Sequence, residues 1–412
     1  MALHPSHRSA VLPAPAPPLG PIDPRARIGL VDAIRGLAVF GILWVNVFMR
    51  SDPIQLSALS QDRDLLGWAV AFTGTLKFRS MFAFLFGLGL AIQAGRAEDE
   101  RRFVRVYLRR LAVLLVLGVV HFALLWPGDI LVMYALCGVG LIWLRRVDER
   151  ILLAVGIAFV VAGMAQQIVG TTFFDKAALR AEVASAYAVY GQGTFAAVTV
   201  RRVHDYLTFW TPALWATFPM VFAMMIFGLL FGRRRYFSRT EERPGLWRRL
   251  CVVGYAVGIP LNALYATWAT SAARSPAFTY VAKSAHALGA PFLCIAYVAT
   301  LVLLWQSRAG KRVLAPLEAV GRMSITAYLG HSVVCSLLFC GYGLGWFGRV
   351  SKAQDVVVCC ALFAAELLFA NTWFRYFRMG PVEWGWRWAT YGTRPGLLRG
   401  RTADPGGAVG LT

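Results

Sequence analysis

The chain has 412 residues, of which 58% are hydrophobic and 15% are charged, and its mean hydropathy is +0.57. A soluble domain is about 45–50% apolar and about 25% charged, so this composition argues against a soluble globular enzyme. The net charge of +21 would suggest nucleic acid as the partner of a soluble protein. Here the basic residues lie between apolar runs, so we expect a lipid bilayer as the partner and no nucleic acid.

The cysteines and the N-terminal segment exclude further classes. All seven cysteines lie inside apolar stretches, without a CxxC pair or a His/Cys cluster at metal-ligand spacing. This pattern predicts neither a disulfide framework nor a metal site. Residues 1–24 are rich in proline and lack the apolar core of a cleaved signal peptide, so we expect a disordered cytoplasmic tail.

Ten segments are mostly apolar over about 20 residues, the length that a membrane-spanning helix needs. The sequence therefore predicts an all-α, polytopic integral membrane protein with about ten transmembrane helices. One segment is long for a single span, and we expect it to be broken or tilted around Lys77 and Arg79. The ten segments are 29–48, 65–93, 104–126, 129–144, 151–170, 211–232, 250–270, 286–306, 323–342 and 355–374.

Basic residues are distributed unevenly between the two sides that ten spans define. If the N-terminus is in the cytoplasm, the cytoplasmic segments hold about three times as many Lys and Arg residues as the outer segments. Both termini are therefore predicted to be cytoplasmic. Arginine far outnumbers lysine, which is typical of a GC-rich bacterial genome and suggests a bacterial cytoplasmic (inner) membrane. The longest outer segment, 171–210, is expected to cap a site or to be a solvated connector.

Ionisable side chains at membrane depth are informative, because inserting each one into the bilayer costs a free energy of about 2.5–3.5 kcal/mol. Each therefore needs a partner, a cavity or a function. In the first segment, Asp32 and Arg35 lie three residues apart on one helical face, and Asn46 follows Arg35 by eleven residues. We expect Arg35 near the inner surface and Asn46 deep or toward the outside. An Asp32–Arg35 pair that only anchors the helix end is the alternative.

Lys77 and Arg79 lie in the middle of their segment, too far from either end to reach the surface along their side chains. We expect them to face a wet cavity, where two cations would suit a phosphate, a carboxylate or a developing oxyanion. A structural ion pair with Glu366 or Asp129 is the alternative. His331 and Glu366 are similarly deep in the last two segments and could form a second pair.

His121 ends the third segment, and Asp129 follows it across a Pro-Gly turn at the predicted outer face. A neutral histidine can take a proton from a hydroxyl, and a carboxylate within reach fixes its tautomer and stabilises the imidazolium. These two residues are the candidate acid/base pair, and a solvated interfacial histidine is the alternative. His204 beside Asp205, and His286, are weaker candidates at segment edges. Phosphate-loop, dinucleotide, zinc-protease and nucleophile-elbow motifs are missing from the sequence.

Several motifs occur in a fixed order between residues 25 and 392: 27–38 with Asn46, 78–89, His121 with 128–131, 321–329, 341–345 and 373–384. On these motifs the chain resembles the YeiB-like family of bacterial membrane proteins, and its C-terminal third resembles the DUF418 domain. The resemblance implies an N-terminal acyltransferase-like transmembrane half (25–232), a C-terminal DUF418 transmembrane domain (233–392) and a disordered tail (393–412).

This family is distantly similar to the transmembrane acyltransferase superfamily, which includes acyltransferase-3 proteins and the lysosomal heparan-glucosaminide acetyltransferase. The resemblance implies transfer of an acyl group such as acetyl from cytoplasmic acyl-CoA to an envelope glycan, a lipid or an exported metabolite, without a metal. In the acyltransferase-3 branch an arginine is followed eleven positions later by a catalytic histidine. Arg35 matches that arginine, but Asn46 stands at the histidine position, so the histidine role falls to His121. His331 stands where many relatives carry glutamine.

In the resulting hypothesis, Arg35, Lys77 and Arg79 position the donor or stabilise the thioester oxyanion, and His121 with Asp129 deprotonates the acceptor. The rival hypothesis is a secondary transporter or flippase that uses charged groups near the bilayer midplane, for which the sequence offers no clear internal repeat. A non-catalytic scaffold leaves the buried charges unexplained. A homodimer is compatible with the sequence. The midplane groups of the rival hypothesis are Lys77, Arg79, His331 and Glu366.

Overall fold

The computed structural model describes residues 28–52, 64–169, 176–271 and 275–399. These residues form helices joined by turns, with one isolated β-bridge between Phe377 and Leu398, so the predicted all-α class is confirmed. The elements are α1 (Gly29–Ser51), α2 (Leu65–Thr73), α3 (Lys77–Ala94), α4 (Glu100–Leu124), α5 (Leu131–Leu144), α6 (Glu149–Val169), α7 (Lys176–Gln192), α8 (Phe195–Asp205), η2 (Tyr206–Trp210), α9 (Thr211–Arg233), η3 (Thr240–Glu242), α10 (Pro244–Ala269), α11 (Pro276–Trp305), α12 (Arg308–Arg322), α13 (Ser324–Phe339), α14 (Lys352–Tyr376) and α15 (Pro381–Tyr391).

Polar side chains set the starts of several of these helices. Asp99, Thr194, Ser275, Ser307 and Ser351 each accept a hydrogen bond from a backbone N–H in the first turn of the helix that follows. Such caps satisfy backbone donors that have no partner within the helix.

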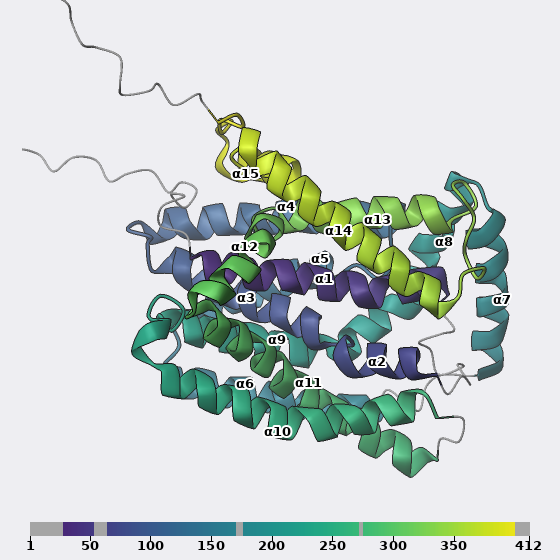
Figure 1. Cartoon of the computed structure of the whole chain (residues 1–412), viewed down its shortest axis with the longest axis horizontal. Coiled ribbons are helices and arrows are strands. Elements are labelled where there is room, and N and C mark those ends of the chain that lie inside the picture. The colour runs from purple at the N-terminus through teal and green to yellow at the C-terminus, as the bar shows by residue number, and fades with distance from the viewer. Residues whose placement is uncertain (1–27, 53–63, 170–175, 272–274, 400–412) are drawn as a thin grey trace, which may run out of the picture.

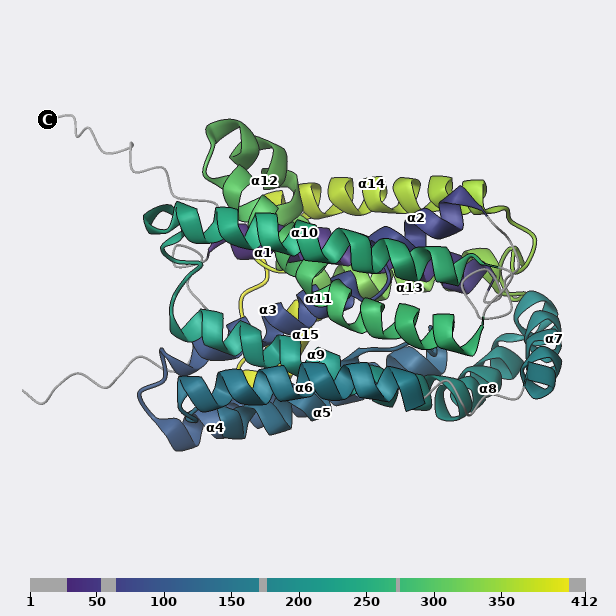
Figure 2. The same cartoon turned by 90° about the horizontal axis from the view of Figure 1, so that it is seen from below.

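The long helices lie side by side in one bundle, with α7 and α8 at one end of it (Figure 1 and Figure 2). Helix α1 is central, because it packs against α3, α11, α12, α13 and α14. The other extensive helix contacts join α3 to α9, α10 to α11, α6 to α9 and α4 to α5. Residues from distant parts of the sequence therefore meet around α1.

Among the described residues, seven helical segments are long and apolar enough to cross a membrane: Gly29–Ser51, Leu65–Ala94, Glu149–Gln166, Phe195–Arg233, Pro244–Ala269, Pro276–Trp305 and Lys352–Tyr376. They coincide with seven of the predicted spans. The predicted segments 129–144 and 323–342 correspond to the shorter apolar helices α5 and α13, and 104–126 corresponds to α4, which is not one of the seven. The chain is thus a membrane protein, and the number of ten spans stays a prediction.

The expected interruption of the second segment is present. Helix α2 ends at Thr73 and α3 begins at Lys77, and Leu76 between them has a positive φ of 65°. The Lys77 ammonium donates a hydrogen bond of 2.9 Å to the carbonyl oxygen of Ala71, near the open end of α2. A cation at a helix C-terminus is favourable, because the last carbonyl oxygens have no helical partner. Lys77 therefore holds the broken span together.

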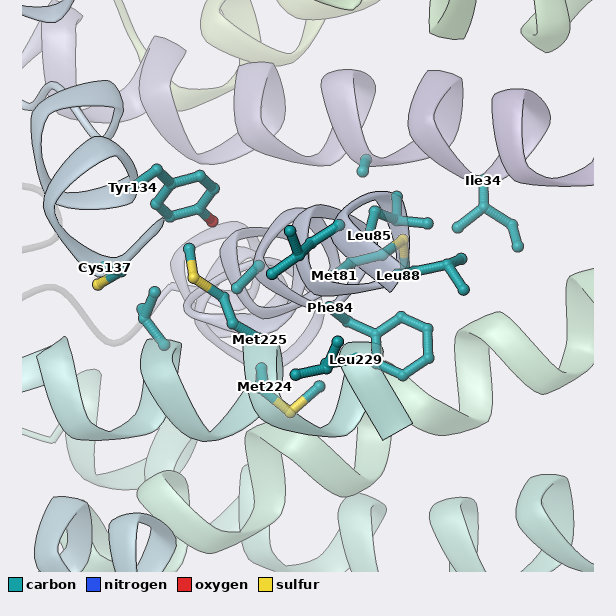
Figure 3. Packing of buried hydrophobic residues seen from close by; sticks show 14 of the residues in the cluster. Ile34, Met81, Phe84, Leu85, Leu88, Tyr134, Cys137, Met224, Met225 and Leu229 are labelled. Carbon is teal, nitrogen blue, oxygen red and sulfur yellow. The ribbon is translucent and has the colours of Figure 1, made fainter. Parts of the chain in front are cut away.

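Helices α3 and α9 approach each other closely through two glycines. A Cβ added at Gly87 would lie 1.8 Å from the carbonyl oxygen of Met225, and one added at Gly228 would lie 1.9 Å from that of Phe84. Around this contact, side chains of the two helices pack into the main core, including Leu88 and Leu229 (Figure 3). Small residues permit such backbone contact between membrane helices.

We predict that Gly87→Ala destabilises the protein by about 1–3 kcal/mol, because the added methyl group meets backbone of α9 that cannot move aside. Gly89→Ala on the same helix is the matched control, since a Cβ there meets nothing within 4 Å. The control is expected to leave stability unchanged or to raise it by up to about 1 kcal/mol. Thermal unfolding in detergent measures both variants, and equal unfolding midpoints would contradict the packing described here.

Candidate functional site

A buried histidine–aspartate pair lies where α4 turns into α5. His121 is in the last turn of α4, and its Nδ1 lies 2.8 Å from Asp129 Oδ1. The second oxygen, Asp129 Oδ2, accepts a hydrogen bond of 2.9 Å from the backbone N–H of Val132 in α5. Gly118 permits this arrangement, because a Cβ there would lie 2.7 Å from the Val132 nitrogen. The predicted pair is therefore formed, and both carboxylate oxygens are in contact with donors.

Both side chains are 0% exposed, so the alternative of a solvated interfacial histidine is wrong. A charge buried in an apolar environment needs compensation by hydrogen bonds or by an opposite charge. With Asp129 as a carboxylate, the proton on the imidazole lies on Nδ1, and Nε2 carries a free lone pair. The tautomer is thus assigned from this hydrogen bond.

The free nitrogen of His121 faces a serine from another part of the chain. Ser332 of α13 places its Oγ 2.9 Å from His121 Nε2, and its side chain is also fully buried. The same Oγ lies 2.8 Å from the carbonyl oxygen of Tyr328, one turn earlier in α13. A hydroxyl has one proton, so it can be donated either to the imidazole or to the helix carbonyl. Asp129, His121 and Ser332 form a continuous chain, which we call the relay.

Arg50, at the end of α1, contacts the serine of the relay. Its Nη2 donates a hydrogen bond of 2.7 Å to Ser332 Oγ, and its Nη1 donates one of 3.2 Å to the Ser332 carbonyl oxygen. The guanidinium lies over the ring of Trp126, 4.6 Å from the centroid. Arg50 is only 4% exposed, and it forms no ion pair with a carboxylate in the part of the chain that the structure describes. Its charge is therefore directed at the Ser332 hydroxyl.

A second buried arginine lies one helical turn away along α13. Arg202 of α8 is 1% exposed and donates hydrogen bonds to Ser336 Oγ (3.0 Å) and to the hydroxyl of Tyr342 (3.1 Å). It also donates to the carbonyl oxygen of Leu124, while Ser336 Oγ donates to that of Leu125 at 2.8 Å. The segment 171–210, which is predicted to lie on the outer side, thus contributes the side chain of Arg202 to the contacts around the turn of the relay.

Helix α13 is fixed at its start by α15. The Glu383 carboxylate accepts hydrogen bonds from the backbone N–H groups of Ile325 (2.8 Å) and Thr326 (3.1 Å), and from the Thr326 hydroxyl. Burial raises the pKa of the Glu383 carboxyl above its ordinary value, and the hydrogen bonds from Thr326 act in the opposite direction. This cap sets the position of the helix that carries Ser332.

His331 and Glu366, the second expected pair, are brought together between α13 and α14. His331 Nδ1 lies 3.3 Å from Glu366 Oε1, and the histidine side chain is fully buried. The separation is that of an ion pair, but neither side chain has a well-directed hydrogen bond within the described residues. Because His331 directly precedes Ser332, this pair adjoins the relay.

Within the described residues, no hydrogen bond or ion pair joins Lys77 or Arg79 to the relay. The expectation of a wet cavity is wrong for Lys77, which is 0% exposed and bonded to Ala71. The alternative of an ion pair with Glu366 or Asp129 is also wrong, because those carboxylates lie against His331 and His121. Arg79 is partly exposed, and its carbonyl oxygen accepts a hydrogen bond of 2.5 Å from the Tyr134 hydroxyl.

The candidates Asp32, Arg35 and Asn46 are divided between the two ends of α1. Arg35 Nη1 donates a hydrogen bond of 2.7 Å to Asp32 Oδ1, as expected for residues on one helical face. Asn46 is partly exposed and lies one turn before Arg50, and in the described part of the chain no hydrogen bond joins it to His121. Asp32 and Arg35 thus lie at the opposite end of α1 from Arg50.

The sequence alone does not reveal the roles of Ser332, Arg50 and Arg202. A serine inside an apolar helix is ordinary, and Arg50 at the end of a span is typical of an interfacial anchor. The available signal is at Ser332, which follows the unusual buried residue His331. Arg202 lies in the segment 171–210, for which the sequence predicts a cap over a site or a solvated connector but no particular functional residue.

Comparison with known proteins places the chain in a family. The family model described as "Protein of unknown function (DUF418)" matches residues 231–393. The chain is 35% identical over 403 residues to the uncharacterized protein YxaH of Bacillus subtilis (strain 168), covering 90% of this chain and 96% of that protein. It is 30% identical over 382 residues to the uncharacterized protein YeiB of Escherichia coli (strain K12), covering 87% and 95%. The chain therefore belongs to the YeiB-like DUF418 family of membrane proteins.

Proposed function

We propose that the protein is a membrane acyltransferase that moves an acyl group, such as acetyl, from cytoplasmic acyl-CoA to a hydroxyl or amine. The acceptor would be an envelope glycan, a lipid or an exported metabolite. The observation that carries this proposal is the relay, in which Asp129 orients His121 and the free imidazole nitrogen lies 2.9 Å from a hydroxyl. That spacing is within reach for proton transfer from a hydroxyl to a general base.

The chemistry follows from the charges around the imidazole. When His121 takes a proton, it becomes an imidazolium, which Asp129 stabilises at 2.8 Å. Fixed charges act strongly in a site that excludes water, because they are not screened and need no reorganisation. Arg50 adds a cation beside the hydroxyl from which the proton leaves. The relay thus favours formation of an attacking oxygen.

The donor assignment rests on the resemblance to acyltransferases, and the cations along the bundle support it. Arg79 and Lys77 lie at the break between α2 and α3, and Arg35 lies near the start of α1. Cationic groups in a membrane interior suit phosphate and thioester oxygens. In this proposal Arg79 contacts the acyl-CoA donor. Lys77 acts indirectly, because its bond to Ala71 fixes the break between α2 and α3 next to Arg79.

The orientation proposed from the sequence is compatible with this arrangement. The starts of α1, α10 and α12 lie toward the end of the bundle that is opposite α7 and α8 (Figure 1). Arginines are concentrated near those helix starts, which favours this end as the cytoplasmic side. In a bacterial inner membrane, the relay would then lie in the outer half of the protein, with both termini in the cytoplasm.

A secondary transporter or flippase is the second candidate, and the His331–Glu366 pair favours it. Buried histidine–carboxylate pairs serve as proton sites in transporters. Counterflow of a substrate in proteoliposomes without any acyl-CoA would favour transport over acyl transfer.

We predict that His121→Ala and Asp129→Asn lower the rate of CoA release from acetyl-CoA by about 10²–10⁴-fold. The alanine variant lacks the base, and asparagine cannot stabilise the imidazolium. The matched control is His204→Ala, because His204 lies 3.5 Å from Asp205 but its side chain is 47% exposed. The assay uses detergent-purified protein and a thiol reagent. A folded His121→Ala variant that releases CoA at the wild-type rate would contradict the proposal.

We also predict that Arg79→Gln weakens saturable binding of acetyl-CoA by about tenfold, the loss expected for one charge-assisted contact. Lys311→Gln at the start of α12 serves as the control, because it removes a cation that is 47% exposed and lies 3.9 Å from Glu241. Isothermal titration measures both variants. Unchanged affinity in Arg79→Gln would remove this residue from the donor site.

A further inference from the structure

We infer that Ser332 is a nucleophile that carries the acyl group as an ester between donor and acceptor. The identity of the donor rests on the proposed function, whereas the reactivity of Ser332 rests on the relay alone. A nucleophilic serine needs a base at its hydroxyl, a group that orients the base, and stabilisation of the charge that develops. The structure supplies a residue for each of these three requirements.

The base and its orienting group are His121 and Asp129. Their side chains come from the end of α4 and from the turn after it, and Ser332 comes from α13, which is 211 residues away from His121 in the sequence. Three segments thus converge with contacts of 2.8 and 2.9 Å and with all three side chains fully buried. Such convergence is not required for packing, which apolar residues would achieve at lower cost.

Stabilisation of charge comes from groups around the hydroxyl. Arg50 donates to Ser332 Oγ at 2.7 Å, so a negative charge on that oxygen would face a cation. Two buried groups nearby, the Tyr328 hydroxyl and Trp126 Nε1, donate no hydrogen bond within the described residues. The Tyr328 ring lies 4.7 Å from the His121 ring, and Trp126 lies under Arg50. Unpaired donors of this kind suit the oxyanion of a tetrahedral intermediate.

Ser336 provides a comparison within the same helix. It lies one turn after Ser332, it is also buried, and it also accepts a hydrogen bond from an arginine, Arg202. Its hydroxyl, however, donates to the Leu125 carbonyl oxygen, which cannot take up a proton. Ser332 alone of these two serines has an imidazole at its hydroxyl.

The reaction balances in two steps. In the first, His121 Nε2 takes the Ser332 proton, Oγ attacks the thioester carbonyl carbon, and the carbon–sulfur bond breaks. The CoA thiolate leaves with the proton from His121, and Ser332 is left as an acyl ester. In the second step, His121 takes a proton from the acceptor hydroxyl or amine, whose oxygen or nitrogen attacks the ester carbon. Ser332 Oγ leaves and regains the proton.

The test labels the full-length, detergent-purified protein with two probes. A fluorophosphonate reacts with an activated serine hydroxyl and releases fluoride, and it does not depend on the natural donor. Acetyl-CoA without acceptor tests the donor of the proposed function. Peptide mass spectrometry locates the modified residue. We expect both labels on Ser332 in the wild type, their loss in Ser332→Ala and in His121→Ala, and unchanged labelling in the matched variant Ser336→Ala.

The outcomes separate this inference from the proposed function. If fluorophosphonate labels Ser332 but acetyl-CoA is not turned over, the nucleophilic role of Ser332 is supported and acetyl-CoA is rejected as the donor. Two results would overturn the nucleophilic role of Ser332 and leave the proposed acyl transfer standing. One is CoA release by a wild-type protein that carries neither label, and the other is CoA release at the wild-type rate by Ser332→Ala. If the wild type carries neither label and releases no CoA, the nucleophilic role of Ser332 and the proposed acyl transfer are both overturned.

A second variant covers the case in which Ser332→Ala fails to fold. Ser332→Cys retains a nucleophilic atom at the same position, and its acetyl adduct would be a thioester rather than an ester. We expect acetyl-CoA to label this cysteine in a form that neutral hydroxylamine removes, while the wild-type label resists it. A cysteine variant that folds and stays unlabelled at position 332 would contradict the inference.

Discussion

The candidate site depends on one constraint: a carboxylate and an imidazole are both completely buried in an apolar helical bundle. Burial of a charged group is expensive unless hydrogen bonds compensate for it. Asp129 is compensated by His121 and by the backbone of α5, and the other nitrogen of His121 lies 2.9 Å from the Ser332 hydroxyl. Each polar group thus fixes the position of the next, and the relay follows from this requirement.

The bundle is organised so that these groups meet. Gly118 lets α5 approach α4, and Glu383 caps the start of α13, so the two sides of the relay are held by contacts outside it. The close contact at Gly87 and Gly228 joins α3 to α9. The relay side chains are therefore held in position by contacts outside the relay, and such preorganisation favours electrostatic stabilisation of a transition state.

Much of this arrangement could be predicted from the sequence, because it depends on local patterns. The apolar runs predict the long helices, and the mid-segment cation Lys77 indicates the break between α2 and α3. The Asp32–Arg35 contact follows from helical spacing. His121 and Asp129 are eight residues apart, so a single turn brings them together. These predictions required no knowledge of how distant helices pack.

The parts that could not be predicted depend on contacts between distant segments. Ser332 is one of several serines in apolar helices, and only the folded structure shows that its side chain meets His121 from the end of α4. Arg50 and Arg202 had the appearance of surface residues, because their positions at helix ends conceal their burial. For Lys77 the sequence predicts a cavity, because its carbonyl partner, Ala71, comes within reach only where the span is broken.

The most direct test of the central claim is a double-mutant cycle at His121 and Asp129, with the rate of CoA release from acetyl-CoA as the readout. If Asp129 acts only through His121, the double variant His121→Ala/Asp129→Asn will be as slow as His121→Ala alone. If the losses of the two single variants multiply in the double variant, Asp129 acts independently of the imidazole, and the relay is not the functional unit.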